Sequence, residues 1–186
     1  MRTYAWPGNR EAARRVAVIL PGAGYTAQAP LLYWSAELLV ERGWHVQAVE
    51  WQITAEVRER SAAFAVEAVE RAFADAPPAD HRLVLAKSFG TFALPWALAN
   101  DVPGVWLTPV LVDAGIRTAL AQAGDRHLAV GGDRDIAWHP VDEVVTKARL
   151  VTVPGADHGL EVGDWRSSVE AHVGVLEHVT RHLQSI

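Results

Sequence analysis

The 186-residue sequence contains no cysteine. A disulfide framework, a thiolate metal site and a cysteine nucleophile are therefore excluded. The sequence also has no run approaching the roughly 20 apolar residues of a membrane span, and residues 1–7 lack the apolar core of a signal peptide. We therefore expect a cytoplasmic protein that has no membrane partner.

The sequence has no excess of positive charge either, with 17 lysines and arginines against 22 acidic residues and a net charge of -5. Proteins that bind nucleic acids present a basic face, so we expect no nucleic-acid partner. The glycine-rich segment Gly22–Tyr25 lacks the third glycine and the acidic residue of a dinucleotide-binding loop. His178 and His182 have the spacing of metal ligands, but no third ligand is evident, and we expect both to face solvent. The sequence thus predicts no cofactor and no metal.

Short apolar segments alternate with longer segments of helical period along the whole chain. Most of the short segments are almost continuously apolar, which is typical of strands covered by helices on both faces. We therefore predict an α/β fold, with residues 1–186 forming one domain around a mainly parallel sheet of six to seven strands with helices on both faces. The predicted strands are Val16–Leu20, Trp44–Trp51, Arg82–Lys87, Val105–Thr108, His127–Gly131 and Leu150–Val153, with Arg2–Trp6 as a weaker edge strand.

The helical segments have less regular boundaries. The last one begins with Ser167-x-x-Glu170, a capping-box pattern, and we expect Val169, Val173, Leu176, Val179 and Leu183 to form its buried stripe. The charged clusters Arg10–Arg15 and Glu56–Arg60 are typical of solvated surface. The predicted helices are Ala29–Arg42, Thr54–Ala74, Phe89–Ala99, Ala114–Ala123, Val141–Lys147 and Ser167–Leu183.

The segment Leu83–Thr91 is an apolar run that ends in a serine between small residues. This pattern predicts a buried strand that turns sharply into a helix, with the Ser88 hydroxyl exposed at the corner. Three other polar segments also follow predicted strands: Gly22–Tyr25, the turn containing Asp133 and Asp135, and Asp157-His158. Because ligands of parallel α/β sheets bind beyond the carboxyl ends of the strands, we expect these segments to meet at one edge.

Serine needs a general base to become nucleophilic at neutral pH, and His158 is the candidate base. A carboxylate would orient the imidazole. Asp135 is our first choice for this acid, Asp133 the second and Asp113 the third. We discount Asp157, because neighbouring side chains in an extended loop point apart.

A developing oxyanion needs donors that are already in place. We expect one from the Phe89 amide and a second from the amide of Ala23 or Gly24. Aromatic residues at or just beyond strand ends are candidates for the walls of a substrate pocket, namely Tyr25, Trp51 and Trp138. Lys87 we interpret as a structural tether.

This pattern resembles the α/β-hydrolase superfamily, in particular its small lid-less serine hydrolases related to dienelactone hydrolase and carrying Lys-Ser-Phe/Leu-Gly. The resemblance covers nearly the whole chain from Val16. It implies a catalytic triad of Ser88 as nucleophile, Asp135 as acid and His158 as base. The chain departs from the usual elbow in having Ala86 in place of the first glycine, and Pro21 replaces the usual histidine before the oxyanion loop.

The segment between Val105–Thr108 and His127–Gly131 is too short for a lid domain. We therefore expect an open, shallow site that hydrolyses small soluble carboxylic esters, with thioesters and acyl transfer as related chemistries. The alternative is a non-catalytic protein of the same fold that binds a small ligand or a protein partner. The sequence does not indicate an oligomeric state.

Overall fold

The computed structural model describes residues 1–9 and 13–186, so part of the charged cluster Arg10–Arg15 lies outside the described residues. One seven-stranded sheet has the spatial order β1-β3-β2-β4-β5-β6-β7. Only β1 runs antiparallel to its neighbour among the described strands. The predicted mainly parallel sheet is confirmed, and every predicted strand agrees to within one residue at each end. The strands are β1 Arg2–Ala5, β2 Arg15–Leu20, β3 His45–Glu50, β4 His81–Lys87, β5 Gly104–Leu107, β6 His127–Gly132 and β7 Arg149–Val153.

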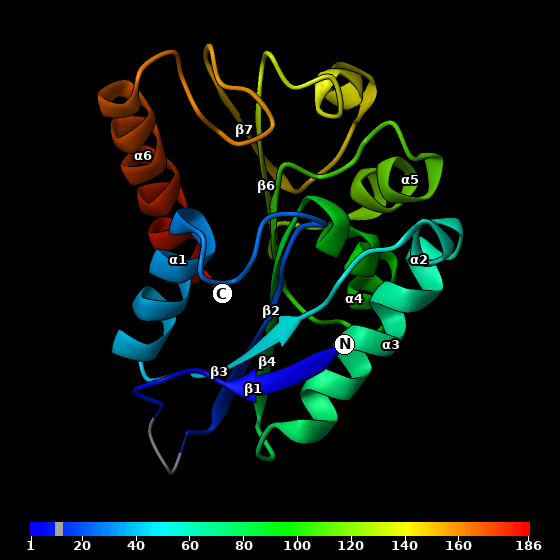
Figure 1. The fold of residues 1–186 in the computed structure, drawn as a ribbon, viewed down its shortest axis with the longest axis vertical. Helices are drawn as coiled ribbons and strands as arrows, with labels where there is room; N and C mark the ends of the chain where they lie inside the picture. The colour runs from blue at the N-terminus through cyan, green and yellow to red at the C-terminus, as the bar shows by residue number, and fades with distance from the viewer. Residues whose placement is uncertain (10–12) are drawn as a thin grey trace.

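Helices cover both faces of the sheet, as predicted. In Figure 1, α1 and α6 lie on one face and α2 to α5 on the other. Each face has its own apolar core, one including Leu31, Leu39 and Val179 and the other including Val69, Leu94 and Leu120. The helices are α1 Pro30–Glu41, α2 Ala55–Glu59, α3 Ser61–Asp75, α4 Leu94–Ala99, α5 Ala114–Gln122 and α6 Trp165–Leu183, with the 3₁₀ helices η1 Ser88–Ala93 and η2 His139–Glu143.

The predicted helix Thr54–Ala74 is divided in the structure. Arg60 leaves the helical region with φ −124° and ψ 34°, which separates α2 from α3. The Ser61 hydroxyl donates to the Arg58 carbonyl at this point. Serine side chains that bond to nearby backbone in this way compete with the helical hydrogen bonds.

The predicted helix Val141–Lys147 is wrong over most of its length, because η2 ends at Glu143 and Val144 is extended. The chain instead crosses to the end of α5, where the Thr146 hydroxyl lies 2.6 Å from the Leu120 carbonyl and 3.0 Å from that of Ala123. This hydroxyl satisfies carbonyls that the end of a helix leaves unpaired.

Helix α6 begins earlier than the predicted capping box. Asp164 is the N-cap, and its carboxylate accepts hydrogen bonds from the amides of Arg166 and Ser167. The predicted buried stripe is also wrong at its start, since Val169 and Val173 are 54% and 51% exposed. The buried residues of α6 are Val175, Val179, His182 and Leu183, so the helix is buried only along its second half.

His127, at the start of β6, is buried against Trp106. Its Nδ1 lies 3.2 Å from the Trp106 Nε1, and since an indole N–H only donates, Nδ1 must accept and stay unprotonated. Burial, aided by the nearby His182 and Arg126, lowers the pKa of His127 to about 4. Between about pH 6.5 and 4 the unfolded chain therefore binds a proton that the folded chain does not.

We predict that the free energy of unfolding falls as the pH drops through this window, by about 3 kcal/mol from His127 alone. His127→Asn keeps an acceptor for the indole but removes the titrating group, so its stability is expected to depend less on pH. Urea unfolding of both proteins between neutral pH and about pH 4 measures the difference. Equal losses of stability in the two proteins would contradict this assignment.

Candidate active site

Ser88 lies at the corner between β4 and η1. Its φ is +50°, in the left-handed region that is costly for any residue with a side chain. Such strain persists only where the surrounding structure enforces it, and it is common at functional sites. The turn brings Ser88 to the carboxyl edge of the sheet, where it lines an open depression.

The elbow is held by close packing on either side of the serine. A Cβ atom on Gly90 would lie 2.5 Å from the carbonyl oxygen of Leu20 and 2.8 Å from its Cβ, so the start of η1 packs directly against the end of β2. Ala86 is fully buried, and its methyl group is accommodated where the hydrolase elbow usually has glycine. The absence of a side chain at Gly90 thus lets the start of η1 approach the end of β2 closely.

His158 joins two side chains that are distant in the sequence. Its Nε2 lies 2.8 Å from the Ser88 Oγ, and its Nδ1 lies 2.7 Å from the Asp135 Oδ2. These distances fit a neutral imidazole that accepts from the serine hydroxyl and donates to the carboxylate. Asp135 is 3% exposed, and its second oxygen accepts the amide of Ala137 at 2.9 Å.

The other candidate acids are bound elsewhere. The carboxylate of Asp133 accepts the Gly155 amide at 2.7 Å, and that of Asp113 accepts the Ile116 amide at the start of α5. Asp157 accepts the Gly159 amide at 2.7 Å within its own loop. Asp135 is thus the candidate carboxylate that contacts the imidazole.

The acid loop and the histidine loop are joined through their backbones. The amide of Arg134 donates to the Ala156 carbonyl at 3.0 Å, and that of Asp133 donates to the Val153 carbonyl at 3.3 Å. A Cβ atom on Gly132 would lie 2.0 Å from the carbonyl oxygen of Ala156, so only glycine permits this approach. These contacts fix the position of Asp135 relative to His158.

The glycine-rich loop after β2 lies beside the serine. A Cβ atom on Gly22 would be 3.5 Å from the Ser88 Cβ. The Gly22 amide donates to the Tyr25 carbonyl at 2.9 Å, and the Trp51 indole donates to the Gly22 carbonyl at 3.0 Å. The Gly22 amide is therefore engaged within the loop. The Ala23 and Gly24 amides of this loop and the Phe89 amide directly after Ser88 remain as candidate oxyanion donors.

Ser88 and His158 line an open depression of about 610 Å³. The side chains at its rim were not predicted from the sequence, and two of them, Val112 and Ile136, are 56% and 76% exposed. Their position in the loops directly after β5 and β6 is the signal that could have identified them. The lining residues that the sequence did not identify are Arg58, Val110, Val112, Arg134, Ile136 and Ala137.

Tyr25 and Trp51 line a separate cavity of about 340 Å³, formed by residues 21–28, the end of β3 and the β1 residues Arg2 and Tyr4. The prediction that Trp138 lines a pocket is wrong. This residue is fully buried, and its indole donates to the Thr152 hydroxyl at 3.0 Å. Gly131 makes room for the ring, since a Cβ there would lie 2.1 Å from the indole.

The expectation that His178 and His182 both face solvent is also wrong, because His182 is 2% exposed and its Nε2 lies 3.3 Å from the Arg126 carbonyl. Residues 1–9 and 13–186 contain no group of three potential metal ligands. Among the helices that the structure describes, none is long and apolar enough to span a membrane.

No family model matches the sequence, and no curated protein is found to be related to it. Solved structures do match. One is an α/β serine hydrolase without a lid from Xanthomonas campestris, with a TM-score of 0.60 and 16% identity over 97% of this chain and 87% of that one. Another is dienelactone hydrolase from Anabaena variabilis, with a TM-score of 0.62 and 20% identity over 91% and 87%. The chain has the α/β-hydrolase fold.

A third neighbour is Est1E from Butyrivibrio proteoclasticus, in a structure with bound ferulic acid. It matches with a TM-score of 0.60 and 14% identity over 96% of this chain and 95% of that one. These neighbours thus match almost the whole chain. At identities of 14% to 20% the likeness shows the fold and not the chemistry.

Proposed function

We propose that this protein is a serine hydrolase that cleaves small carboxylic esters through an acyl-enzyme on Ser88. The observation that carries the proposal is the unbroken hydrogen-bonded chain from the Ser88 hydroxyl through His158 to Asp135, with links of 2.8 and 2.7 Å. This arrangement has a nucleophile within contact of a base and a base held by a third group.

In the acylation step the Ser88 Oγ attacks the ester carbonyl carbon while the His158 Nε2 takes the hydroxyl proton. The carbonyl π electrons move to its oxygen, and the amides of Phe89 and of Ala23 or Gly24 stabilise the resulting oxyanion. The tetrahedral intermediate then collapses. The bond to the alcohol oxygen breaks, and the imidazolium gives its proton to the departing alcohol.

In the deacylation step water attacks the acyl carbonyl and His158 accepts a proton from it. The second tetrahedral intermediate expels the serine oxygen, which recovers its proton from the imidazolium. Asp135 keeps the Nδ1 proton in place in both steps and stabilises the positive charge on the ring. The carboxylic acid leaves and the enzyme returns to its starting state.

The open depression around Ser88 supports small, soluble esters as substrates. Its exposed apolar side chains, Val112 and Ile136, suit a short acyl or alcohol group, whereas a long lipid chain would stay largely in water. The ferulic acid in the Est1E structure is a carboxylic acid held by a protein of this fold. Thioesters would react by the same steps, because the acyl carbon is attacked in the same way.

The competing function is a non-catalytic protein of this fold that binds a ligand. A fluorophosphonate probe and short p-nitrophenyl esters separate the two. The wild type is expected to label and to release p-nitrophenol, and Ser88→Ala is expected to do neither. Labelling that persists in Ser88→Ala would exclude the assigned nucleophile, and a folded wild type that neither labels nor turns over would favour the binding protein.

A further inference from the structure

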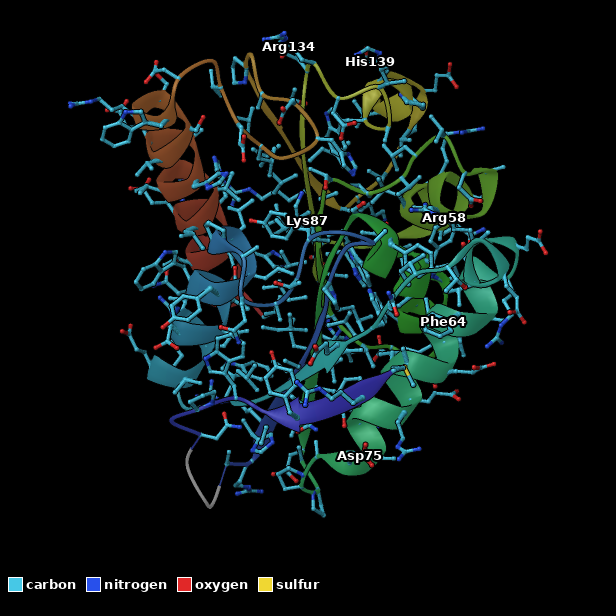
Figure 2. The ribbon with its side chains drawn as sticks, viewed as in Figure 1. Arg58, Phe64, Asp75, Lys87, Arg134 and His139 are labelled. Atoms are coloured by element: carbon cyan, nitrogen blue, oxygen red, sulfur yellow. The ribbon has the colours of Figure 1, made fainter. Side chains whose placement is uncertain are left out.

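Lys87, the residue before Ser88, has its ammonium group inside the protein. The residue is 1% exposed, and Figure 2 shows it between the helical layers, far from the peripheral Arg134 and His139. Its Nζ donates to the Thr108 hydroxyl at 2.9 Å and to the main-chain carbonyl of His158 at 2.8 Å. The Tyr25 ring centroid lies 4.8 Å from the same nitrogen. The three N–H groups of an ammonium thus have two oxygen acceptors and one aromatic face.

These partners come from different segments of the candidate active site. Thr108 directly follows β5, His158 lies in the loop after β7, and Tyr25 belongs to the glycine-rich loop. Lys87 itself is bonded covalently to Ser88. One side chain therefore links the nucleophile to the base loop and contacts the loop that carries the candidate oxyanion donors.

Three of the linked segments contain strained backbone. Four non-glycine residues have positive φ within residues 1–9 and 13–186, and three of them are Ser88 at +50°, Thr108 at +46° and Leu160 at +62°. Thr108 accepts from Lys87 directly, and Leu160 lies two residues after His158. Strained backbone persists only where surrounding contacts hold it, and the Lys87 ammonium supplies such contacts.

Burying the Lys87 ammonium in this space is unfavourable in free energy. Burial lowers the pKa of Lys87 to about 8, although the Asp135, Asp157 and Glu161 carboxylates act in the opposite direction. An apolar side chain of similar volume would avoid the cost of removing an ammonium from water. Packing alone therefore gives no reason for a lysine here, whereas an N–H donor directed at the His158 carbonyl does.

We propose that Lys87 is a positioning residue that holds the His158 main chain in place so that the imidazole stays within proton-transfer distance of the Ser88 hydroxyl. This inference rests on the proposed hydrolase function. Lys87 takes no proton from the substrate and touches no reacting atom. It acts through the carbonyl of the residue whose ring is the base.

Replacing Lys87 with methionine keeps most of the volume and removes every donor. Freed from this contact, the His158 loop is expected to shift, and a displacement of about 1 Å in a reacting group lowers rates by about 100-fold. We therefore expect kcat to fall about 100-fold in Lys87→Met, with KM changed less than about threefold, because substrate binding does not depend on proton transfer. The stability of Lys87→Met is expected to equal or exceed that of the wild type, since no buried charge remains.

The test compares the wild type with Lys87→Met, Lys87→Gln and Lys147→Met, using p-nitrophenyl ester kinetics and the rate of fluorophosphonate labelling. Total labelling counts the folded, reactive sites, so kcat is expressed per competent enzyme. The glutamine variant retains N–H donors without a charge and is expected to recover part of the lost kcat. Lys147 is the other lysine of the sequence and is exposed, so it controls for losing a lysine.

A low kcat with unchanged KM in Lys87→Met, and partial recovery in Lys87→Gln, would support the proposal. A Lys87→Met kcat within about threefold of the wild type per competent site would overturn it, and so would a change confined to KM. If Lys87→Met does not fold, the kcat of Lys87→Gln decides. A kcat below that of the wild type is expected without the ammonium, and a wild-type kcat would overturn the proposal. If the wild type shows neither labelling nor turnover, the proposed hydrolase function fails. This result is obtained before any Lys87 variant is made, so the two failures can be told apart.

Discussion

Alanine at His158 is expected to lower kcat for a p-nitrophenyl ester by about 10⁶-fold, because the Ser88 hydroxyl loses the group that removes its proton. Ser88→Ala is expected to lose as much. Steady-state kinetics with high enzyme concentrations measures both, with binding of a non-hydrolysable ester analogue as the check that each variant is still folded.

The two substitutions are expected not to add. Serine and histidine act as one unit, so the Ser88→Ala, His158→Ala double variant should be about as slow as either single variant. Losses that multiply would mean that the two side chains act independently, and this would contradict the 2.8 Å contact as the route of proton transfer. Residual activity of His158→Ala within about tenfold of the wild type would exclude His158 as the base.

The second large effect is expected at Asp135. Asparagine there can donate to the imidazole through its amide, which favours the tautomer with its proton on Nε2 and leaves no acceptor for the serine hydroxyl. A loss of about 10⁴-fold in kcat follows from the wrong tautomer. Kinetics on folded, probe-counted enzyme measures this loss.

Asp133→Asn is the matched control for this substitution. Its carboxylate accepts the Gly155 amide at 2.7 Å, and the carbonyl oxygen of asparagine can accept the same bond. We therefore expect kcat within about tenfold of the wild type. A larger loss for Asp133→Asn than for Asp135→Asn would reverse the assignment of the acid.

The sheet could be predicted from the sequence because its strands are buried on both faces. Segments such as Val16–Leu20 are continuously apolar, and this signal does not depend on distant contacts. Helix boundaries were less predictable, because they depend on local competition for hydrogen bonds. Ser167-x-x-Glu170 fits a capping box, yet Asp164 caps α6 with two amide contacts three residues earlier.

The shared location of the candidate triad could be predicted from chain order, because a serine, an acid and a histidine that each follow a parallel strand must reach the same edge of the sheet. The choice between Asp133 and Asp135 needed coordinates, since both occupy one turn. Trp138 could not be separated from a pocket residue, because a buried and a lining tryptophan look alike in sequence. The space that takes its ring exists only because Gly131 has no side chain.

The contacts of Lys87 were the least predictable part of the site. A lysine before the nucleophile has no periodic or motif signal that gives the direction of its side chain. Its acceptors, Thr108 and the His158 carbonyl, are 21 and 71 residues away in the sequence. Only the folded sheet brings them together.

The proposed mechanism depends most on Ser88 becoming covalently acylated. The direct measurement is to quench the wild type during turnover of a p-nitrophenyl ester and to locate the acyl group by mass spectrometry of peptides. We predict an acyl group on Ser88. It accumulates when deacylation, in which His158 activates water, is slower than acylation. Continued turnover with no covalent intermediate under any quench, or an acyl group confined to another residue, would contradict the account.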